Sequence, residues 1–273
     1  MILGSTSTDR FRGGQGNDSL DGGAGTSDMV DYANLAASQA VSVNLASGRA
    51  NDGQGGTDTL ISIEQVRGTA GNDTIIGDGV DNIFRGNAGS DSLDGGAGTG
   101  DVADYAFATS AVSVNLTTGR ANDGQGGTDT LANIERVWGS AFADTLIGGA
   151  GNDVLRGNAG NDSLEGGSGA DHFIFNTALG TANVDRIQSY SATDDTILLD
   201  DAIFTALGSP GALAAGAFKA GAAATDADDR IIYNATTGAL FYDQDGNGAT
   251  AAVQFATLTS ITGTITHADF LII

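Results

Sequence analysis

Aspartates recur at nine-residue intervals between residues 148 and 171, where the sequence reads GGAGNDVLR, GNAGNDSLE and GGSGAD in succession. The shared unit is G-G-x-G-x-D-x-U-x, in which U is a large apolar residue. Glycine allows a sharp turn whose backbone carbonyls point inward, and aspartate supplies a hard oxygen ligand of the kind that Ca²⁺ prefers. The apolar residue can anchor a very short strand in a core. This spacing predicts calcium sites on the turns of a strand-based solenoid.

Copies of the same unit are spread along the chain up to residue 171. Clear copies begin at Gly13, Gly22, Gly86 and Gly95, weaker ones at Gly4, Gly68, Gly77 and Gly139, and offset ones at Gly53 and Gly124. A flexible linker rich in Gly and Asp is the alternative. A linker would not hold apolar residues in register, as the units do with Leu20, Ile75, Phe84, Leu93, Leu146, Leu155 and Leu164. The sequence therefore favours a structural repeat.

The repeat aspartates are the predicted metal ligands. Two nonapeptides complete one turn, so Asp144 should lie over Asp162 and Asp153 over Asp171, 18 residues apart. Stacked carboxylates repel each other unless a divalent cation lies between them. The predicted ligand side chains are Asp9, Asp18, Asp28, Asp73, Asn82, Asp91, Asp101, Asp144, Asp153, Asp162 and Asp171. The predicted glycine ligands are Gly14, Gly16, Gly89, Gly149, Gly151, Gly160, Gly167 and Gly169. The copy that begins at Gly86 has Asn87 where the unit has its second glycine, so this position is not included.

Two alternatives stay open for these aspartates. A turn-forming role explains each aspartate singly, but not the periodicity of the set. Asp58 and Asp129 lie in the offset copies, where the sequence decides neither for nor against a ligand role.

A second candidate calcium loop lies near the C-terminus. Asp243, Asp245 and Asn247, followed by Gly248, match the first positions of an EF-hand loop. The twelfth position is Gln254 instead of Glu, and the flanks read as strands. We predict Asp243, Asp245 and Asn247 as ligands, with a plain D-G-N-G turn as the alternative.

Composition points to a cation as partner. The chain of 273 residues has 34 acidic and 11 basic residues and a formal net charge of -23. Such a charge disfavours nucleic acid and anionic membranes as partners. Roughly six to eight Ca²⁺ ions, about one per pair of turns, would neutralise about half or more of it. There is no cysteine, and no apolar run is long enough to span a membrane.

Catalytic motifs are missing, so we predict that the protein is not an enzyme. Its two histidines, His172 and His267, cannot form an HExxH zinc site. There is no G-x-S-x-G serine and no P-loop, and the G-x-G matches belong to the nonapeptides.

The predicted fold is all-β, a calcium-stabilised parallel β-roll or β-solenoid. Residues 1–174 form the roll, with two long modules offset by 71 to 73 residues and a partial third. Each long module contains an excursion (residues 29–67 and 102–138) with a strand at residues 41–45 or 112–116. Residues 175–273 form a β-rich cap with a hairpin at 230–242 and one short helix near residues 201–207.

These motifs resemble the RTX (repeats-in-toxin) hemolysin-type calcium-binding proteins. The DHFIF segment at 171–175 is similar to the end of the β-roll in serralysin-type proteases, and residues 184–199 resemble the region that follows it. The terminal residues 269–273, DFLII, resemble a type I secretion signal. The resemblance implies export from a Gram-negative cell by type I secretion machinery, and folding outside the cell or at its surface when calcium binds.

The expected function is that of a secreted calcium-binding β-roll with a structural, matrix, surface or export-folding role. The alternative is a non-catalytic C-terminal calcium-binding and secretion module of a larger secreted protease, lipase or polysaccharide-modifying enzyme. Self-association through the open solenoid end and binding to a cell-surface polysaccharide are the further partners considered. Ice binding is disfavoured because the third repeat position is never threonine in the clear copies.

Overall fold

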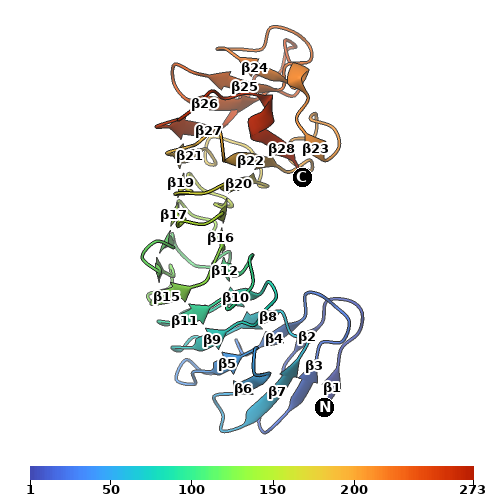
Figure 1. Ribbon diagram of the computed structural model, residues 1–273, viewed down its shortest axis with the longest axis vertical. Helices are drawn as coiled ribbons and strands as arrows, with labels where there is room; N and C mark the ends of the chain where they lie inside the picture. Colours follow the sequence, from blue (N-terminus) through green and yellow to red (C-terminus); the bar gives the residue numbers. More distant parts are fainter. The chain divides into compact units, whose positions relative to one another are not determined.

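The computed structural model describes residues 1–273, which group into two compact units, Met1–Trp138 and Gly139–Ile273. This grouping follows contacts and is a different division from the predicted boundary between roll and cap at residue 174, which stays a prediction. The all-β fold with parallel sheets is confirmed (Figure 1). None of the chain's helices has the length and apolar character needed to span a bilayer.

The N-terminal unit consists of very short strands that belong to two sheets (Figure 1). Its wide sheet has the order β1 (Ile2–Leu3), β3 (Ser19–Asp21), β7 (Thr57–Ile61), β6 (Arg49–Asn51), β5 (Ser42–Asn44), β9 (Thr74–Ile76), β11 (Ser92–Asp94), β15 (Thr128–Ala132), β14 (Arg120–Asn122) and β13 (Ser113–Asn115). Its narrow sheet has the order β2 (Arg10–Phe11), β4 (Met29–Asp31), β8 (Gln65–Arg67), β10 (Ile83–Arg85), β12 (Val102–Asp104) and β16 (Arg136–Trp138).

The predicted period of 18 residues is present in the strand register. Thr74 lies opposite Ser92 in the wide sheet, and Gln65 lies opposite Ile83 in the narrow sheet. Most of these strands have three residues, of which the central apolar one is buried, as for Leu93 and Phe84. A three-residue strand has only one inward side chain, because successive side chains alternate between faces. Each sheet therefore contributes a single file of apolar residues to the core.

Each excursion replaces one strand of the wide sheet by three. Strand β6 pairs antiparallel with both β5 and β7. Strand β7 in turn pairs parallel with β3, and β5 pairs parallel with β9. In the narrow sheet β4 pairs directly with β8, so the added strands have no counterpart there. Strands β13–β15 repeat this arrangement. The predicted strands at 41–45 and 112–116 are confirmed, whereas β6 and β14 were not foreseen.

The C-terminal unit begins as a regular roll and ends in a broader sheet (Figure 1). One sheet has the order β17 (Thr145–Ile147), β19 (Ser163–Glu165), β21 (Asp185–Gln188), β27 (Val253–Thr259), β26 (Ala239–Tyr242), β25 (Ile231–Asn234) and β24 (Phe218–Ala220). The other has the order β18 (Val154–Arg156), β20 (His172–Phe175), β22 (Thr196–Leu199), β28 (Phe270–Ile272) and β23 (Gly211–Ala212).

Aromatic side chains fill the core at the end of this roll. Phe204 packs edge-to-face against Tyr242 and Phe255, with ring centroids 5.2 and 5.3 Å apart, and Phe175 contacts Phe255 in the same way. Edge-to-face pairs add packing energy beyond area burial. The predicted hairpin is confirmed as β25 and β26, with Gly238 in a left-handed conformation at φ +76°.

The predicted helix near residues 201–207 is wrong. The segment forms turns in which Ile203 N and Phe204 N both donate to Asp200 O, and the Asp200 carboxylate accepts from Ala202 N. A helix this short gains too few hydrogen bonds to offset its nucleation cost, and Gly208, at φ +95°, ends the segment. The short 3-10 helices lie instead at Ala215–Ala217 and His267–Asp269.

Candidate metal centres

Acidic side chains form a ladder along each edge of the roll, which we call the edge ladders. One ladder precedes the inward residues of the wide sheet and its C-terminal counterpart: Asp18, Asp58, Asp73, Asp91 and Asp129 in the N-terminal unit, and Asp144, Asp162 and Asp185 in the C-terminal unit. The other precedes the narrow sheet and its counterpart: Asp9, Asp28, Glu64, Asn82, Asp101 and Glu135, then Asp153, Asp171 and Asp195.

We call each residue of a ladder a rung. A repeated hydrogen bond joins neighbouring rungs. Oδ1 of each later aspartate accepts from the backbone N–H of the rung before it, at 2.7 Å from Asp73 to Asp91, 2.8 Å from Asp144 to Asp162 and 2.9 Å from Asp153 to Asp171. The same bond joins Asp9 to Asp28 at 2.7 Å and Asn82 to Asp101 at 2.7 Å. The structure thus brings together each pair of side chains that the 18-residue period placed side by side.

In six rungs the second carboxylate oxygen has no such partner. Oδ2 is buried and accepts no hydrogen bond in Asp18, Asp28, Asp91, Asp101, Asp162 and Asp171. A buried acceptor without a donor loses its hydration and gains nothing in return, at a cost of about 1–3 kcal/mol and more when it is charged. A bound cation would remove this cost, so these atoms fit a metal site.

Backbone carbonyls complete the oxygen-rich environment. A Cβ built at Gly148 would lie closer than 3.0 Å to both the carbonyl oxygen of Gly166 and Oδ2 of Asp153. Gly4 meets Gly22 O and Asp9 Oδ2 in the same way, and Gly77 meets Gly95 O and Asn82 Oδ1. Oxygen atoms of two successive turns therefore gather where a side chain would otherwise be. Multiple oxygen donors of this kind suit Ca²⁺.

The predicted glycine ligands take two roles. Gly14, Gly16, Gly89, Gly160, Gly167 and Gly169 adopt left-handed conformations, with φ between +87° and +133°. The carbonyl oxygens of Gly16, Gly89, Gly149 and Gly151 face glycines of the following turn. No group of three or more His, Cys, Asp or Glu side chains is placed so that the side chains alone could hold a metal ion. Carbonyls must therefore supply much of any coordination shell.

Burial shifts the titration of the rungs, because desolvation disfavours the charged carboxylate. It raises the pKa of Asp91 and of Asp162 to about 8, and the pKa of Asp185 to about 7. Neighbouring carboxylates, Asp129 beside Asp91 and Asp185 beside Asp162, raise the pKa further, while the backbone donors lower it.

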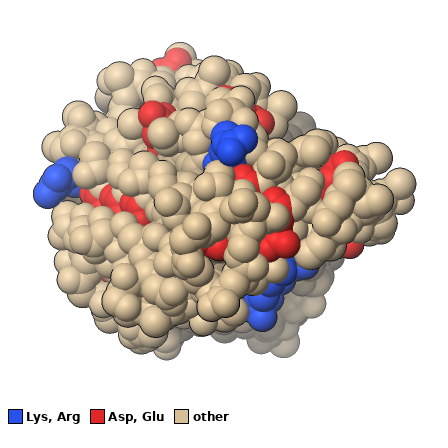
Figure 2. Space-filling view, turned by 90° about the horizontal axis from the view of Figure 1, so that it is seen from below, with Lys and Arg blue, Asp and Glu red and all other residues tan.

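Arginine neutralises carboxylates that lie outside the ladders. Arg10 and Arg12 pair with Asp31, and Arg85 pairs with Asp104 while its guanidinium lies 4.0 Å from the ring centre of Phe107. On the face seen in Figure 2, acidic side chains show as narrow patches among other residues and basic side chains are few.

Several rungs were missed from the sequence. Glu64 and Glu135 accept from the backbone N–H of Asp28 and Asp101, at 2.9 and 3.0 Å, as an aspartate would. Asp185 and Asp195 extend the ladders into the end of the roll, accepting from Asp162 N and Asp171 N. All share one signal that would have found them: an acidic residue two places before a buried apolar one.

The loop at residues 243–248 folds as hydrogen-bonded turns. Asp243 Oδ1 accepts from Asp245 N at 3.3 Å, Asp245 Oδ2 accepts from Thr250 N at 3.0 Å, and Asn247 N donates to Asp226 O. These bonds suit the turn interpretation, although Asp245 Oδ1 is buried without a partner. A calcium role for Asp243, Asp245 and Asn247 stays a prediction.

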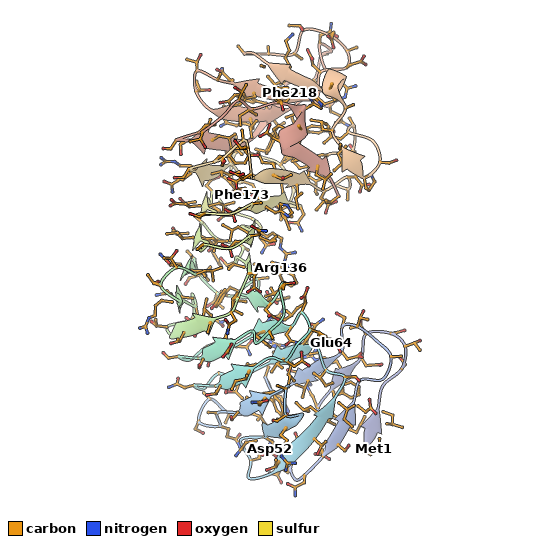
Figure 3. All side chains as sticks on the ribbon, viewed as in Figure 1. Met1, Asp52, Glu64, Arg136, Phe173 and Phe218 are labelled. Carbon is orange, nitrogen blue, oxygen red and sulfur yellow. The ribbon has the colours of Figure 1, made fainter.

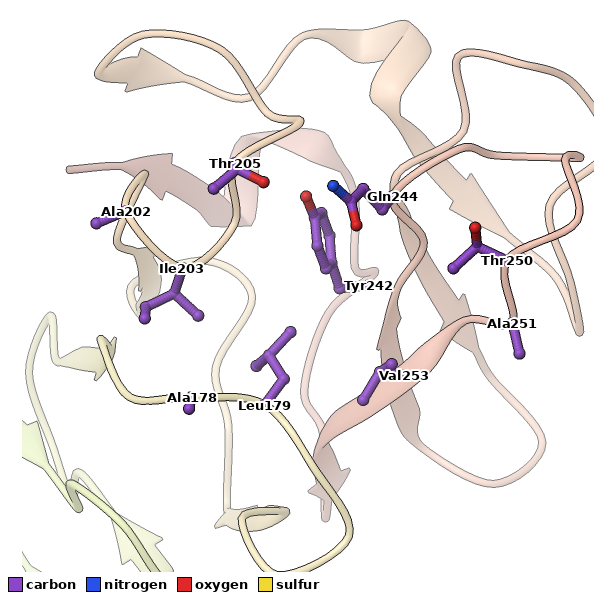
Figure 4. Close-up of a pocket in the computed structure, with 10 residues that line it drawn as sticks. All are labelled: Ala178, Leu179, Ala202, Ile203, Thr205, Tyr242, Gln244, Thr250, Ala251 and Val253. Carbon is purple, nitrogen blue, oxygen red and sulfur yellow. The ribbon is translucent and has the colours of Figure 1, made fainter.

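A cavity of about 320 Å³ lies in the C-terminal unit, and no ladder residue lines it. Figure 4 shows the side chains that do. Leu179, Ile203 and Val253 line it together with Tyr242 and Gln244, and no carboxylate does. The Tyr242 hydroxyl accepts from Ala206 N at 2.7 Å. This lining offers no set of metal ligands.

The fold and the ladders define the class of the protein, a β-roll built to hold cations between its turns. The RTX calcium-binding nonapeptide repeat (4 copies) matches residues 2–26, 67–102 and 138–173. These segments are therefore RTX-type calcium-binding repeats, and repeats of this type bind several Ca²⁺ ions. No curated protein matches the chain.

Replacing Gly148 tests the carbonyl-lined part of the sites. Gly148→Ala places Cβ against Gly166 O and Asp153 Oδ2. We expect it to weaken calcium binding and to lower the free energy of unfolding in calcium by about 1–3 kcal/mol, as overpacking does. The control is Gly216→Ala in the 3-10 helix Ala215–Ala217, because a Cβ there meets nothing within 4 Å and the residue lies outside the ladders. Equal calcium affinity and stability in the two variants, measured by calorimetry and denaturant unfolding, would contradict the arrangement.

Protonation of the buried carboxylates should stabilise the calcium-free roll in part, as bound calcium does. The pKa values of Asp91 and Asp162 lie near 8 in the folded chain, above the value of 3.8 for a free carboxyl. Between these limits the folded state binds more protons than the unfolded state, so stability falls as pH rises. Chelator-treated protein, largely unfolded at pH 8, should therefore regain β-structure in its circular dichroism spectrum as the pH falls to 5. In saturating calcium the spectrum should stay β-rich over this range; a β-signal of the chelator-treated protein that rises with pH would refute the prediction.

Proposed function

We propose that this protein is a secreted β-roll whose folding is switched on by Ca²⁺ outside the cell. The observation that carries the proposal is the set of buried, unpartnered Oδ2 atoms along both edge ladders. Without a cation these carboxylates oppose folding, and with one they become its ligands. Calcium binding and folding are then a single equilibrium.

A calcium switch suits export. A chain that stays unfolded where calcium is scarce can pass through a narrow exporter, and it folds where calcium is plentiful. The proposed export route is type I secretion from a Gram-negative cell, by analogy with the family that the repeats resemble. We assign the cap and the export signal to residues 175–273. In the folded protein the terminal segment is strand β28, which pairs with β22 and β23.

The proposed role outside the cell is structural, not catalytic. The matched repeats are calcium-binding modules, and the cavity of the C-terminal unit holds no carboxylate or histidine. A matrix or surface component is the role that such a roll supports, with a cell-surface polysaccharide or further copies of the chain as partners.

A calcium titration tests the proposal. Far-UV circular dichroism of chelator-treated protein should change cooperatively from a disordered to a β-rich spectrum, with a midpoint of about 10⁻⁴–10⁻³ M Ca²⁺. Mg²⁺ is the control, because it demands tighter octahedral geometry and gives up its water reluctantly. It should have little effect at equal concentration. A β-rich spectrum that chelation leaves unchanged would rule out the switch.

A further inference from the structure

Each excursion carries a second buried aspartate that belongs to neither ladder. Asp52 lies in the turn between β6 and β7 (Figure 3), and Asp123 lies in the corresponding turn between β14 and β15. Both residues are fully buried, at 0 % exposure. The flanking sequences are identical, NDGQGGTDTL in each module, so the same arrangement occurs twice in one unit.

One carboxylate oxygen of each residue shapes its own turn. Asp52 Oδ1 accepts from Gln54 N at 2.7 Å and from Gly56 N at 2.8 Å. Asp123 Oδ1 accepts from Gln125 N and Gly127 N at the same distances. This turn role accounts for Oδ1 alone.

The other oxygen is buried and accepts no hydrogen bond in either residue. It is directed at the neighbouring turn of the roll. A Cβ built at Gly56 would lie closer than 3.0 Å to both Asp52 Oδ2 and the carbonyl oxygen of Gly16. A Cβ at Gly127 meets Asp123 Oδ2 and Gly89 O in the same way. Two oxygen acceptors thus face the same space without a donor between them.

The turn below carries a further unpartnered oxygen. The loop of residues 52–58 stacks directly on residues 13–18, since Asp18 N donates to Asp58 Oδ1 at 3.0 Å and Thr57 N donates to Asn17 Oδ1 at 2.8 Å. Asp18 Oδ2, two residues from the Gly16 carbonyl, is itself buried without a partner. In the second module Asp91 N donates to Asp129 Oδ1, and Asp91 Oδ2 is likewise buried without a partner.

Tyrosine makes these turns differ from an ordinary rung. The Tyr32 hydroxyl donates to Asp58 Oδ2 at 3.1 Å, and the Tyr105 hydroxyl donates to Asp129 Oδ2 at 2.9 Å. The second oxygen of the rung is therefore already satisfied. Asp52 and Asp123 provide the free oxygen that the rung no longer offers.

We propose that each excursion builds an additional Ca²⁺ site, with Asp52, Asp18 and the Gly16 carbonyl as ligands of one and Asp123, Asp91 and the Gly89 carbonyl as ligands of the other. All these donors are oxygen atoms, which favours a hard cation such as Ca²⁺ over a metal that prefers nitrogen or sulfur. Asp52 and Asp123 lie outside the segments that the nonapeptide repeat matches. Such a site would fasten the inserted strands to the roll.

This inference rests on calcium binding by the roll, and counting bound ions separates the two. Asp52→Asn and Asp123→Asn keep Oδ1 as an acceptor and remove the charge. In the full chain, native mass spectrometry in saturating Ca²⁺ should show one ion fewer for each variant and two fewer for the double variant. The control is Asp81→Asn, which removes an exposed carboxylate outside the ladders and should leave the count unchanged.

The outcomes are distinct. A wild-type chain that binds no calcium would overturn the proposed function itself. A wild-type chain that binds calcium, with folded variants that bind the same number of ions, would overturn this inference alone. Should neither variant fold, crystals of the wild-type protein grown with Tb³⁺ decide: an anomalous peak beside Asp52 Oδ2 and Asp123 Oδ2 supports the sites, and its absence overturns them.

Discussion

Burial of carboxylate oxygens that accept no hydrogen bond is the constraint on which this β-roll depends. The nonapeptide turns place one oxygen of each rung on a backbone N–H and leave the other inside the loop, as in Asp91 and Asp162. The apolar core offers little to offset this, because each three-residue strand contributes only one inward side chain. A cation between the turns would coordinate these same oxygens and remove the cost of burying them, which is why we propose that metal binding and folding are coupled.

The excursions keep the hydrogen bonds between successive turns and do not interrupt the roll. Three antiparallel strands take the place of one in the wide sheet, and the rung that follows keeps its backbone hydrogen bond through Asp58 or Asp129. Tyr32 and Tyr105 satisfy the spare oxygen of that rung. The ladders therefore continue past each insertion, with Glu64 and Glu135 as the longer rungs of the opposite edge.

The nonapeptide pattern predicts much of this structure because its chemistry is local. Glycine, aspartate and an apolar residue at fixed spacing determine the turn and the strand, so the pairing of Asp144 with Asp162 could be read from an interval of 18 residues. The pairing of strands outside the nonapeptides was not predicted from the sequence. Strands β6 and β14 have a small buried alanine, Ala50 or Ala121, and are held by hydrogen bonds to both neighbours. The nonapeptide pattern does not mark Asp52, because the surroundings of its second oxygen are formed by the adjacent turn.

Amide hydrogen exchange at the rungs tests the central claim most directly. The backbone N–H groups of Asp73, Asp144 and Asp153 donate to the carboxylates of the next turn. If cations hold these turns together, NMR should show these amides strongly protected in millimolar calcium and exchanging rapidly after chelation. Equal protection with and without calcium would contradict the account, because the roll would then bury its carboxylates unaided.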